Sequence, residues 1–263
     1  MKEILKSPKP LVIAHRGDSR HFPENTSSSF RSAIEKGAQM IECDVQLSRD
    51  RVPMIIHDPS LDRTTNGTGK IGEETFDELL KLDCGSWFSE SFHGETILSL
   101  QQMLERFSGQ ILLNLEIKKE SVESEMKADG IEALVCNMVH DYGFQDRVLI
   151  SSFHHVCLKR VKEHDDSLPV APLLDTPKTF SELQMMYKDH DAFSIHMDEK
   201  HLERNLIQKM KESGIPLLCY TVNDLERKQE LTEWGITGII SDDTTMLKKI
   251  VSYKILHEDL WEN

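Results

Sequence analysis

Two short segments carry carboxylates at alternate positions, which is the spacing of side chains that share one face of a β-strand. Glu42 and Asp44 lie two residues apart in the segment 40–47, and Glu116 follows the same alternation in the segment 111–118. Apolar residues fill the intervening positions, so the acidic side chains are expected to point away from the apolar face. Three convergent carboxylates with no cysteine on their face suit one divalent cation, Mg2+ or Ca2+, better than Zn2+.

The competing interpretation of these carboxylates is a network of ion pairs. Lys118 shares a strand face with Glu116 and Asn114. A buried carboxylate without compensation is strongly unfavourable, so positive charge must lie close to this face. A single acidic residue in a strand most often forms an ion pair with Lys or Arg. Acidic side chains at alternate positions on two different strands favour a bound cation instead.

Two histidines follow apolar segments in the same half of the chain. His15 comes after the segment 11–14 and His57 after the segment 53–56. An imidazole titrates near neutral pH, so it can serve as a general acid or a general base. The chain contains 12 histidines, and a lone histidine at a strand end is more often structural. The position of these two beside the carboxylates is what makes them candidates for catalysis.

The elements that must position these residues alternate along the chain. Short apolar segments are followed by longer segments of helical periodicity, which is typical of βαβ units and a parallel sheet. Eight strands are expected, at 11–14, 40–45, 111–117, 148–151, 170–174, 192–195, 216–221 and 237–241. Helices are expected between them, at 28–36, 126–141, 201–213 and 225–233 among others.

Eight repeats in 263 residues predict an α/β fold, a (β/α)8 TIM barrel. An open, doubly wound sheet is the alternative. The barrel is favoured because its active sites lie at the C-terminal ends of the strands, where the carboxylates and both histidines would converge. One barrel domain is therefore expected over residues 1–263. The segment 59–98, rich in Gly, Thr, Ser and Asp, is expected to be a small insertion over one end of it.

Composition narrows the function classes. Acidic residues outnumber basic ones by 45 to 31, and the net charge of −14 opposes binding to nucleic acid and stable association with anionic membranes. No apolar run is long enough to span a membrane or to form a secretory signal. Five scattered cysteines favour a reducing cytoplasm. A small-molecule substrate is the expected partner, and the oligomeric state stays open.

A series of short motifs runs through the chain. In the first third these are His15-Arg16-Gly17, Pro23-Glu24-Asn25-Thr26, Glu42-Cys43-Asp44, His57-Asp58 and the segment 61–69, and later ones lie at 83–88, 114–118, 151–153, 221–223 and 238–242. Their order and spacing closely resemble those of the glycerophosphodiester phosphodiesterase family. The resemblance covers nearly the whole chain and is most specific in its N-terminal third.

The resemblance implies a metal-dependent enzyme. It implies a (β/α)8 barrel, hydrolysis of a glycerophosphodiester to glycerol 3-phosphate and an alcohol, a divalent cation held by Glu42, Asp44 and Glu116, and an acid-base pair in His15 and His57. Which histidine is the acid stays open, as does the nucleophile, which is either water or the neighbouring glycerol hydroxyl. The headgroup and the choice between Mg2+ and Ca2+ stay open too.

Other residues are candidates for binding the substrate. Arg16 and Lys118 are expected to contact the phosphate, because the global negative charge requires local cations to hold a phosphodiester. Tyr220 stands where many family members carry Trp before Thr-Val-Asn, so a stacking role on the glycerol side is expected in modified form. Phe153 is a further candidate for the substrate pocket. Trp87 either lines the same pocket or packs inside the insertion.

Two further functions compete with the hydrolysis of small glycerophosphodiesters. A phospholipase C-like or phospholipase D-like barrel acting on lysophospholipids would use the same cation and histidines, but it would need an apolar surface for lipid. A non-catalytic barrel that binds a phosphoester would be expected to lack a metal carboxylate or a histidine. The sequence retains all of these residues.

Overall fold

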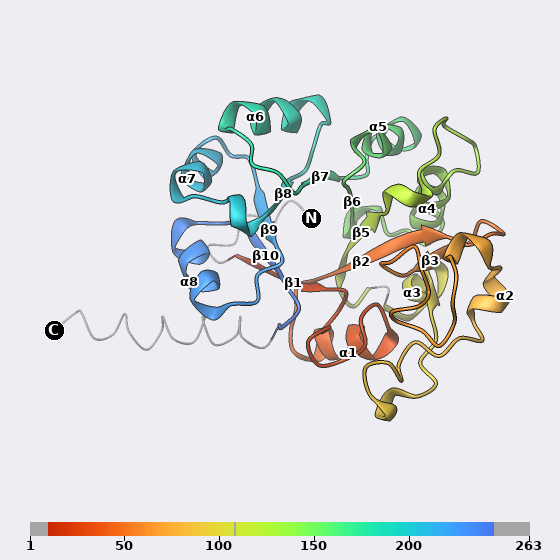
Figure 1. The fold of residues 1–263 in the computed structure, drawn as a ribbon. Helices are drawn as coiled ribbons and strands as arrows, with labels where there is room; N and C mark the ends of the chain where they lie inside the picture. The colour runs from red at the N-terminus through yellow and green to blue at the C-terminus, as the bar shows by residue number, and fades with distance from the viewer. Residues whose placement is uncertain (1–9, 108, 245–263) are drawn as a thin grey trace.

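The computed structural model describes residues 10–107 and 109–244 and shows a closed barrel of eight parallel strands surrounded by helices (Figure 1). The barrel strands are β1 (Leu11–His15), β2 (Met40–Leu47), β5 (Leu112–Ile117), β6 (Val148–Ser152), β7 (Val170–Leu174), β8 (Ile195–Asp198), β9 (Leu217–Tyr220) and β10 (Gly238–Ser241). They pair in the order β1, β10, β9, β8, β7, β6, β5, β2, and pairing of β2 with β1 closes the ring. The expected TIM barrel is confirmed, and the open sheet is excluded.

Helices cover the outside of this barrel. They are α1 (Ser27–Glu35), α3 (Leu100–Phe107), α4 (Ile131–Asp141), α5 (His155–His164), α6 (Phe180–Asp189), α7 (Arg204–Glu212) and α8 (Leu225–Trp234). The short helix α2 (Phe76–Leu79) belongs to the insertion, and single 3-10 turns lie at Ile71–Glu73, Glu90–Phe92, Lys119–Ser121, Gln145–Arg147 and Glu199–His201. No helix among the described residues is both long enough and apolar enough to cross a membrane.

Alternation along β2 sets the direction of the acidic side chains. Ile41, Cys43 and Val45 belong to the large core between the sheet and the helices. The intervening Glu42 and Asp44 therefore point into the barrel. The lower part of the barrel interior is filled by an apolar cluster of Leu11, Ile13, Met40, Leu218 and Ile240. The acidic side chains thus lie above an apolar base, at the end of the barrel where the strands finish.

His57 reaches this end of the barrel by a route that the sequence did not predict. The strand before it, β3 (Pro53–Ile55), is not a barrel strand; it pairs antiparallel with β2, with Val45 opposite Ile55. The short β4 (Leu98–Ser99) extends the same edge. Because β3 runs back along β2, its end returns to the site, where the Ile56 N–H donates to the Asp44 carbonyl at 3.0 Å.

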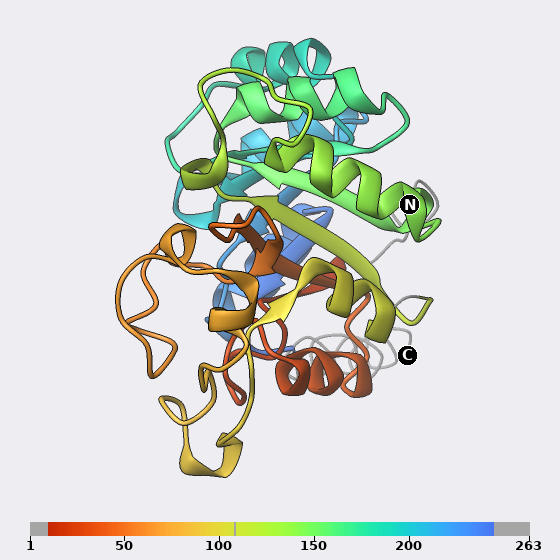
Figure 2. The same cartoon turned by 90° about the vertical axis from the view of Figure 1, so that its right-hand side faces the viewer.

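The segment 59–98 has a small apolar core of its own. Leu61, Ile71, Leu79 and Cys84 pack together with Met54 and other residues next to β3. Figure 2 shows this segment projecting from one side of the barrel. Trp87, Phe88 and Phe92 form successive edge-to-face contacts, with ring centroids 5.7 and 5.8 Å apart. The aromatic residues of this segment thus pack on one another.

Several element boundaries differ from the expected ones. β8 was expected at 192–195 but runs from Ile195 to Asp198, because its pairing with β9 begins at Ile195, opposite Leu217, and its pairing with β7 begins at His196. α4 was expected from 126 but begins at Ile131, after an N-cap at Gly130. All five cysteines are buried and unpaired. The N-terminal segment considered for an export signal, residues 1–9, lies outside the described residues.

Candidate active site

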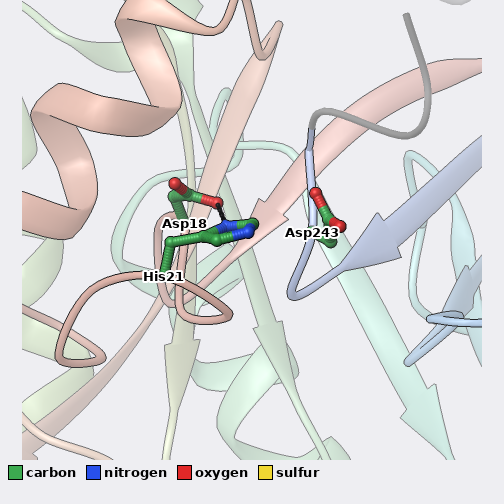
Figure 3. A group of neighbouring side chains, drawn as sticks. All are labelled: Asp18, His21 and Asp243. Atoms are coloured by element: carbon green, nitrogen blue, oxygen red, sulfur yellow. Dashed lines mark hydrogen bonds and ion pairs between the residues drawn. The ribbon is translucent and has the colours of Figure 1, made fainter. Parts of the chain in front are cut away.

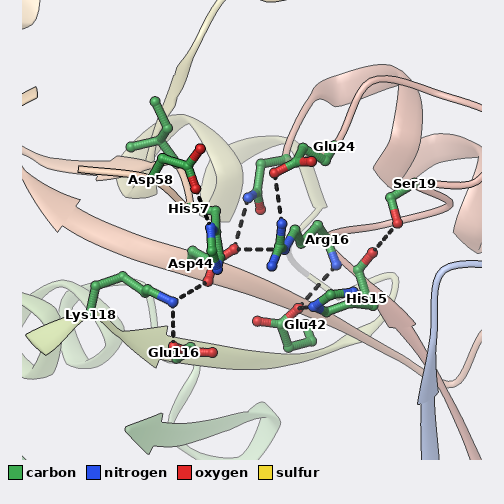
Figure 4. Close-up of polar contacts among 12 residues, drawn as sticks. His15, Arg16, Ser19, Glu24, Glu42, Asp44, His57, Asp58, Glu116 and Lys118 are labelled. Atoms are coloured by element: carbon green, nitrogen blue, oxygen red, sulfur yellow. Dashed lines mark hydrogen bonds and ion pairs between the residues drawn. The ribbon is translucent and has the colours of Figure 1, made fainter. Parts of the chain in front are cut away.

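Three carboxylates meet at the open end of the barrel, as the strand alternation predicted. In the parallel pairing of β2 with β5, Asp44 lies beside Glu116, and Glu42 lies beside Asn114. One oxygen each of Glu42, Asp44 and Glu116 lies within 4.8 Å of the others. Figure 4 shows these three side chains at the end of the barrel. Glu42 and Asp44 are almost fully buried, and the side chain of Glu116 is largely buried.

The pKa values of the three carboxyl groups are shifted in different directions. Burial raises the pKa of Glu42 well above its usual value, and the neighbouring Asp44 and Glu116 raise it further. Burial and the charge of Asp44 raise the pKa of Glu116 to about 7, against the opposing effect of Lys118. For Asp44, burial is outweighed by the nearby charges of Arg16 and Lys118, which lower its pKa. The three groups carry more negative charge than their surroundings compensate.

The two cations expected near the phosphate both reach this cluster. Lys118 donates to Glu116 Oε1 at 2.7 Å and lies 3.3 Å from Asp44 Oδ1. The Arg16 guanidinium donates through Nη1 to Glu24 Oε1 at 2.9 Å, and its Nε lies 3.3 Å from Asp44 Oδ2. The backbone N–H of Arg16 donates to Glu42 Oε2 at 3.0 Å. Both side chains border the cluster, and their role toward phosphate stays a prediction.

His15 is oriented by a residue from the other end of the chain. Its Nδ1 lies 2.5 Å from Asp242 Oδ1. Burial opposes ionisation of Asp242, but hydrogen bonds from His15, Asn223 and Ser19 lower its pKa to about 2. An ionised carboxylate can only accept, so the Nδ1–H of His15 donates to it. Nε2, 3.9 Å from Glu42 Oε2, is left facing the carboxylate cluster.

His57 is oriented in the same way by its neighbour in the sequence. Its Nδ1 lies 2.6 Å from Asp58 Oδ1. A hydrogen bond from Arg63 lowers the pKa of Asp58 to about 2, so this carboxylate is an acceptor as well. Burial lowers the pKa of His57 itself, which favours its neutral form. Both imidazoles therefore present Nε2 as the nitrogen that is available to a substrate.

A chain of ion pairs joins the two sides of the site. Arg63 donates through Nε to Asp58 at 2.5 Å and through Nη1 and Nη2 to the two oxygens of Glu24, each at 2.7 Å. Glu24 in turn accepts from Arg16. This chain fixes the guanidinium of Arg16 beside Asp44 (Figure 4). Through Arg63 it also ties the start of the insertion to the loop that follows β1.

The loop after β1 is shaped by its glycine and by the start of α1. Gly17 has a φ of 83°, and a Cβ there would lie 2.4 Å from Ser29 Oγ, so only glycine fits. Thr26 caps α1, accepting from the Ser29 N–H at 3.3 Å. Asn25, just before this cap, donates to Asp44 Oδ2 at 2.9 Å. The motifs around Arg16 and Asn25 thus shape the loop and hold Asp44.

These groups surround one cavity of about 180 Å³. It is lined by both histidines, by Glu42 and Glu116, by Arg16 and Lys118, and by Asn114, Phe153, Leu173, Tyr220, Thr221 and Ile240. An adjoining cavity of about 290 Å³ is bordered by His57, Pro59, Lys119, Glu120, Phe153 and Asp175, among others. A larger depression of about 420 Å³, near Arg49 and Lys70, contains neither histidine.

The predicted pocket residues divide into two groups. Phe153 and Tyr220 line the cavity, with ring centroids 5.9 Å apart in an edge-to-face contact. Trp87 is not among the described residues that line either cavity containing His57. Its Nε1 donates to the Cys84 carbonyl at 2.9 Å, inside the insertion. The insertion contributes only Pro59 to the described lining of these two cavities.

A second group of possible metal ligands lies outside these cavities. Asp18, His21 and Asp243 each offer an atom within 4.8 Å of the others (Figure 3). Lys36 already lies 2.5 Å from Asp18 Oδ2, and the Ser32 hydroxyl donates to the same oxygen at 2.7 Å. This ammonium compensates the buried carboxylate, so the second group needs no cation.

The group of Glu42, Asp44 and Glu116 fits a divalent cation better. Glu42 Oε1 is buried and has no hydrogen-bond partner within the described part of the chain. All the potential ligand atoms are carboxylate oxygens, the donors that Mg2+ and Ca2+ prefer. A cation bound there would satisfy the free oxygen and compensate the charge that raises the pKa values of Glu42 and Glu116.

Two functional candidates were not recognised from the sequence, Asp242 and Asp58. Asp58 directly follows His57, and this adjacency was the available signal. Asp242 lies 227 residues from His15. The signals for Asp242 were its place at the end of the motif 238–242 and its position just after the last expected strand, which becomes the neighbour of the first strand when a barrel closes.

Comparison with known proteins finds a matching family and similar chains. The sequence pattern of the Glycerophosphoryl diester phosphodiesterase family matches residues 15–246. A glycerophosphodiester phosphodiesterase of Caldanaerobacter subterraneus is 38% identical over 244 residues, which cover 92% of this chain and 98% of the relative. A putative glycerophosphodiester phosphodiesterase of Bacillus subtilis is 36% identical over 88% of this chain and 93% of its own.

Solved structures show the same architecture. An Oleispira antarctica phosphodiesterase, in complex with the product sn-glycerol-3-phosphate, superposes with a TM-score of 0.85 at 30% identity, covering 94% of this chain and 99% of the other. A glycerophosphodiester phosphodiesterase from Agrobacterium tumefaciens gives a TM-score of 0.80 at 26% identity, covering 91% and 99%.

Proposed function

Because the chain belongs to the glycerophosphoryl diester phosphodiesterase family, we propose that Glu42, Asp44 and Glu116 hold its divalent cation and that His15 and His57 transfer the protons of the reaction. The chain is a phosphoric diester hydrolase that acts on glycerophosphodiesters. The observation that carries the proposal is one cavity of about 180 Å³ that is lined by both histidines, each paired with a carboxylate, and by Glu42 and Glu116 of the three-carboxylate cluster.

The acid-base step follows from the orientation of the imidazoles. Asp242 and Asp58 hold the Nδ1–H of His15 and His57, so each ring can exchange a proton only through Nε2. One Nε2 accepts the proton of the attacking hydroxyl, and the other donates a proton to the departing alcohol oxygen. The attacking hydroxyl is water or the neighbouring glycerol hydroxyl, which would give a cyclic phosphate first.

Charge stabilisation comes from both sides of the cavity. Arg16 and Lys118 are proposed to bind the phosphate oxygens, because their cationic groups border the cavity and the net charge of the chain is −14. A bound divalent cation, Mg2+ or Ca2+, would polarise a phosphate or hydroxyl oxygen as a Lewis acid. Phe153 and Tyr220 are proposed to contact the organic part of the substrate.

The test of this function is a substrate panel. Glycerophosphocholine, glycerophosphoethanolamine, glycerophosphoglycerol and a lysophospholipid are each assayed with Mg2+ and with Ca2+, and the products are identified. Release of glycerol 3-phosphate from the three small diesters is expected. If only the lysophospholipid is hydrolysed, the enzyme is a phospholipase instead. If hydrolysis is equally fast without any divalent cation, the reaction does not need a metal ion.

The cellular compartment, the partner and the domain organisation of the enzyme are proposed on separate grounds. Five buried, unpaired cysteines are those of a protein kept in a reducing compartment, so we propose a cytoplasmic enzyme. The charge of −14 favours a small-molecule substrate over nucleic acid as its partner. One barrel domain over residues 1–263, with 59–98 as an insertion, is proposed because this segment has its own small core packed beside β3.

Replacement of Arg16 by lysine is expected to lower kcat/KM. A lysine cannot keep the planar fork that reaches Glu24 and the phosphate together. Losing one hydrogen bond to a charged group costs about 1.5–3 kcal/mol, which corresponds to a roughly tenfold to hundredfold drop. Steady-state kinetics of Arg16→Lys beside Arg49→Lys, an exposed arginine, provide the measurement. Equal kinetics in the two variants would limit Arg16 to a structural role.

Replacement of Asp242 by asparagine is expected to lower kcat with little change in KM. The amide can donate to Nδ1 and so favour the wrong tautomer of His15. The loss should approach that of removing the histidine, roughly 10²- to 10⁴-fold for general acid-base catalysis. In His15→Ala/Asp242→Asn, the second change should then cost almost nothing. Independent, multiplicative losses would show that Asp242 does not act through His15.

A further inference from the structure

Asn114 is a buried polar side chain that the proposed mechanism leaves unused. It lies on β5, is fully buried, and lines the cavity that contains both histidines. Neither its Oδ1 nor its Nδ2 has a hydrogen-bond partner among the residues that the structure describes. A buried amide without partners is unfavourable, because it gives up its hydrogen bonds to water and gains none in the protein. Such a group in a native fold calls for a partner that protein side chains do not provide.

The strand register shows which partner is available. Glu42 pairs with Asn114 and Asp44 with Glu116, so four inward side chains on β2 and β5 form a two-by-two array. Three corners of the array are the carboxylates that fit a cation, and Asn114 is the fourth. The neighbouring Glu42 Oε1 is also buried and without a partner in the described residues. Two adjacent oxygen-bearing groups therefore lack partners at the same place.

We propose that Asn114 belongs to the cation site and supplies a neutral oxygen donor through Oδ1, either directly or through one water molecule. An amide oxygen is a common ligand of hard cations, and it adds no negative charge to a crowded set of carboxylates. A neutral donor suits this site, because Glu42, Asp44 and Glu116 already place three carboxylate oxygens within 4.8 Å of one another. A fourth carboxylate would add to the repulsion between them.

A different explanation for Asn114 would be a buried water unrelated to any cation. His196 on β8 is a comparable buried polar side chain in this protein. It is fully buried, and its Nδ1 also lacks a hydrogen-bond partner in the described part of the protein. His196 is not among the described residues that line the cavity with Glu42, and its neighbours in the strand register are Leu173 and Leu218. It therefore serves as a control for the loss of a buried polar group.

The test measures cation binding rather than turnover. Isothermal titration with Mg2+ and with Ca2+ is carried out on the wild type, Asn114→Leu, Asn114→Asp, His196→Leu and Glu42→Gln, with far-UV circular dichroism to confirm folding. Loss of a group that supports a metal typically costs about 10- to 100-fold in affinity, and this is the loss expected for Asn114→Leu. Asn114→Asp keeps an oxygen, and the repulsion that its charge adds to the metal-free protein is relieved when a cation binds, so this variant is expected to bind at least as tightly as the wild type. His196→Leu should bind as the wild type does.

The outcomes separate this inference from the function on which it rests. If the wild type binds neither cation, or Glu42→Gln binds as well as the wild type, the proposed carboxylate site itself fails. If the wild type binds and folded Asn114→Leu has the same Kd, only the role of Asn114 is overturned. Equal weakening in Asn114→Asp and Asn114→Leu would overturn the oxygen-donor role.

A measurement on the unmodified protein covers the case in which Asn114→Leu does not fold. Crystals soaked in Mn2+ locate the cation by anomalous scattering. Asn114 Oδ1 should lie within a coordination distance of about 2.0–2.6 Å of the ion or hydrogen-bond to a water that does. An ion bound by the carboxylates with Asn114 contacting neither it nor its water would overturn the inference.

Discussion

Removing the divalent cation is expected to abolish hydrolysis. A phosphodiester anion bound in the cavity would lie close to the cluster of Glu42, Asp44 and Glu116, and without a cation these carboxylates would repel it. A metal ion contributes several kcal/mol of charge stabilisation, so we expect a roughly 10³-fold or greater loss of kcat/KM. The measurement is activity after dialysis against a chelator, with the metal content determined, followed by titration with Mg2+ or Ca2+.

Glu42→Gln should reproduce this loss without unfolding the protein. Burial and the neighbouring Asp44 raise the pKa of Glu42, so a neutral amide relieves repulsion in the metal-free state. The Tm of metal-free Glu42→Gln should therefore equal or exceed that of the metal-free wild type, while its activity falls. Glu35→Gln, at an exposed carboxylate on α1, is the control. Full activity in the stripped enzyme, or in Glu42→Gln, would end the assignment of the metal site.

The acidic cluster could be predicted because it depends on backbone geometry alone. Side chains alternate along any strand, so Glu42 and Asp44 had to share a face opposite Ile41 and Cys43. Closure of the barrel then brings the ends of β2 and β5 together, and their pairing places Asp44 beside Glu116. No knowledge of particular side-chain contacts was needed for this step.

The partners of the histidines could not be predicted in the same way. His57 reaches the site because β3 folds back along β2, whereas the sequence indicated only an apolar strand that ended in a histidine. The contact of His15 with Asp242 needs the pairing of the first strand with the last, as well as the exact path of two loops. Such contacts depend on tertiary structure, which local periodicity does not encode.

The positions of the aromatic residues could likewise be predicted only where the barrel strands determine them. Phe153 and Tyr220 lie at the ends of barrel strands and line the cavity, because the barrel fixes where strand ends point. Trp87 lies in an insertion without a repeating pattern, and its direction depends on the small core formed there. A residue type suited to stacking on a substrate is equally suited to such a core.

The histidines are expected to be nearly as important as the cation. Single replacement of His15 or His57 by alanine should lower kcat by roughly 10²- to 10⁴-fold, the usual contribution of general acid-base catalysis. Both variants should remain folded, because each ring lies at the edge of the cavity and not in the apolar core. His140→Ala, at an exposed histidine on α4, is the control. Wild-type kcat in both folded variants would exclude this mechanism.

The choice of substrate can then show which histidine is the acid. A p-nitrophenyl phosphodiester has a leaving group that departs without protonation, whereas choline and glycerol alkoxides need a proton from the enzyme. The variant lacking the general acid should therefore recover most of its loss on the activated ester, while the variant lacking the general base should not. Burial lowers the pKa of His57 and favours its neutral, proton-accepting form, so recovery is expected in His15→Ala. Recovery in His57→Ala alone would reverse these roles, and equal losses of both variants on both substrates would show that neither histidine protonates the leaving oxygen.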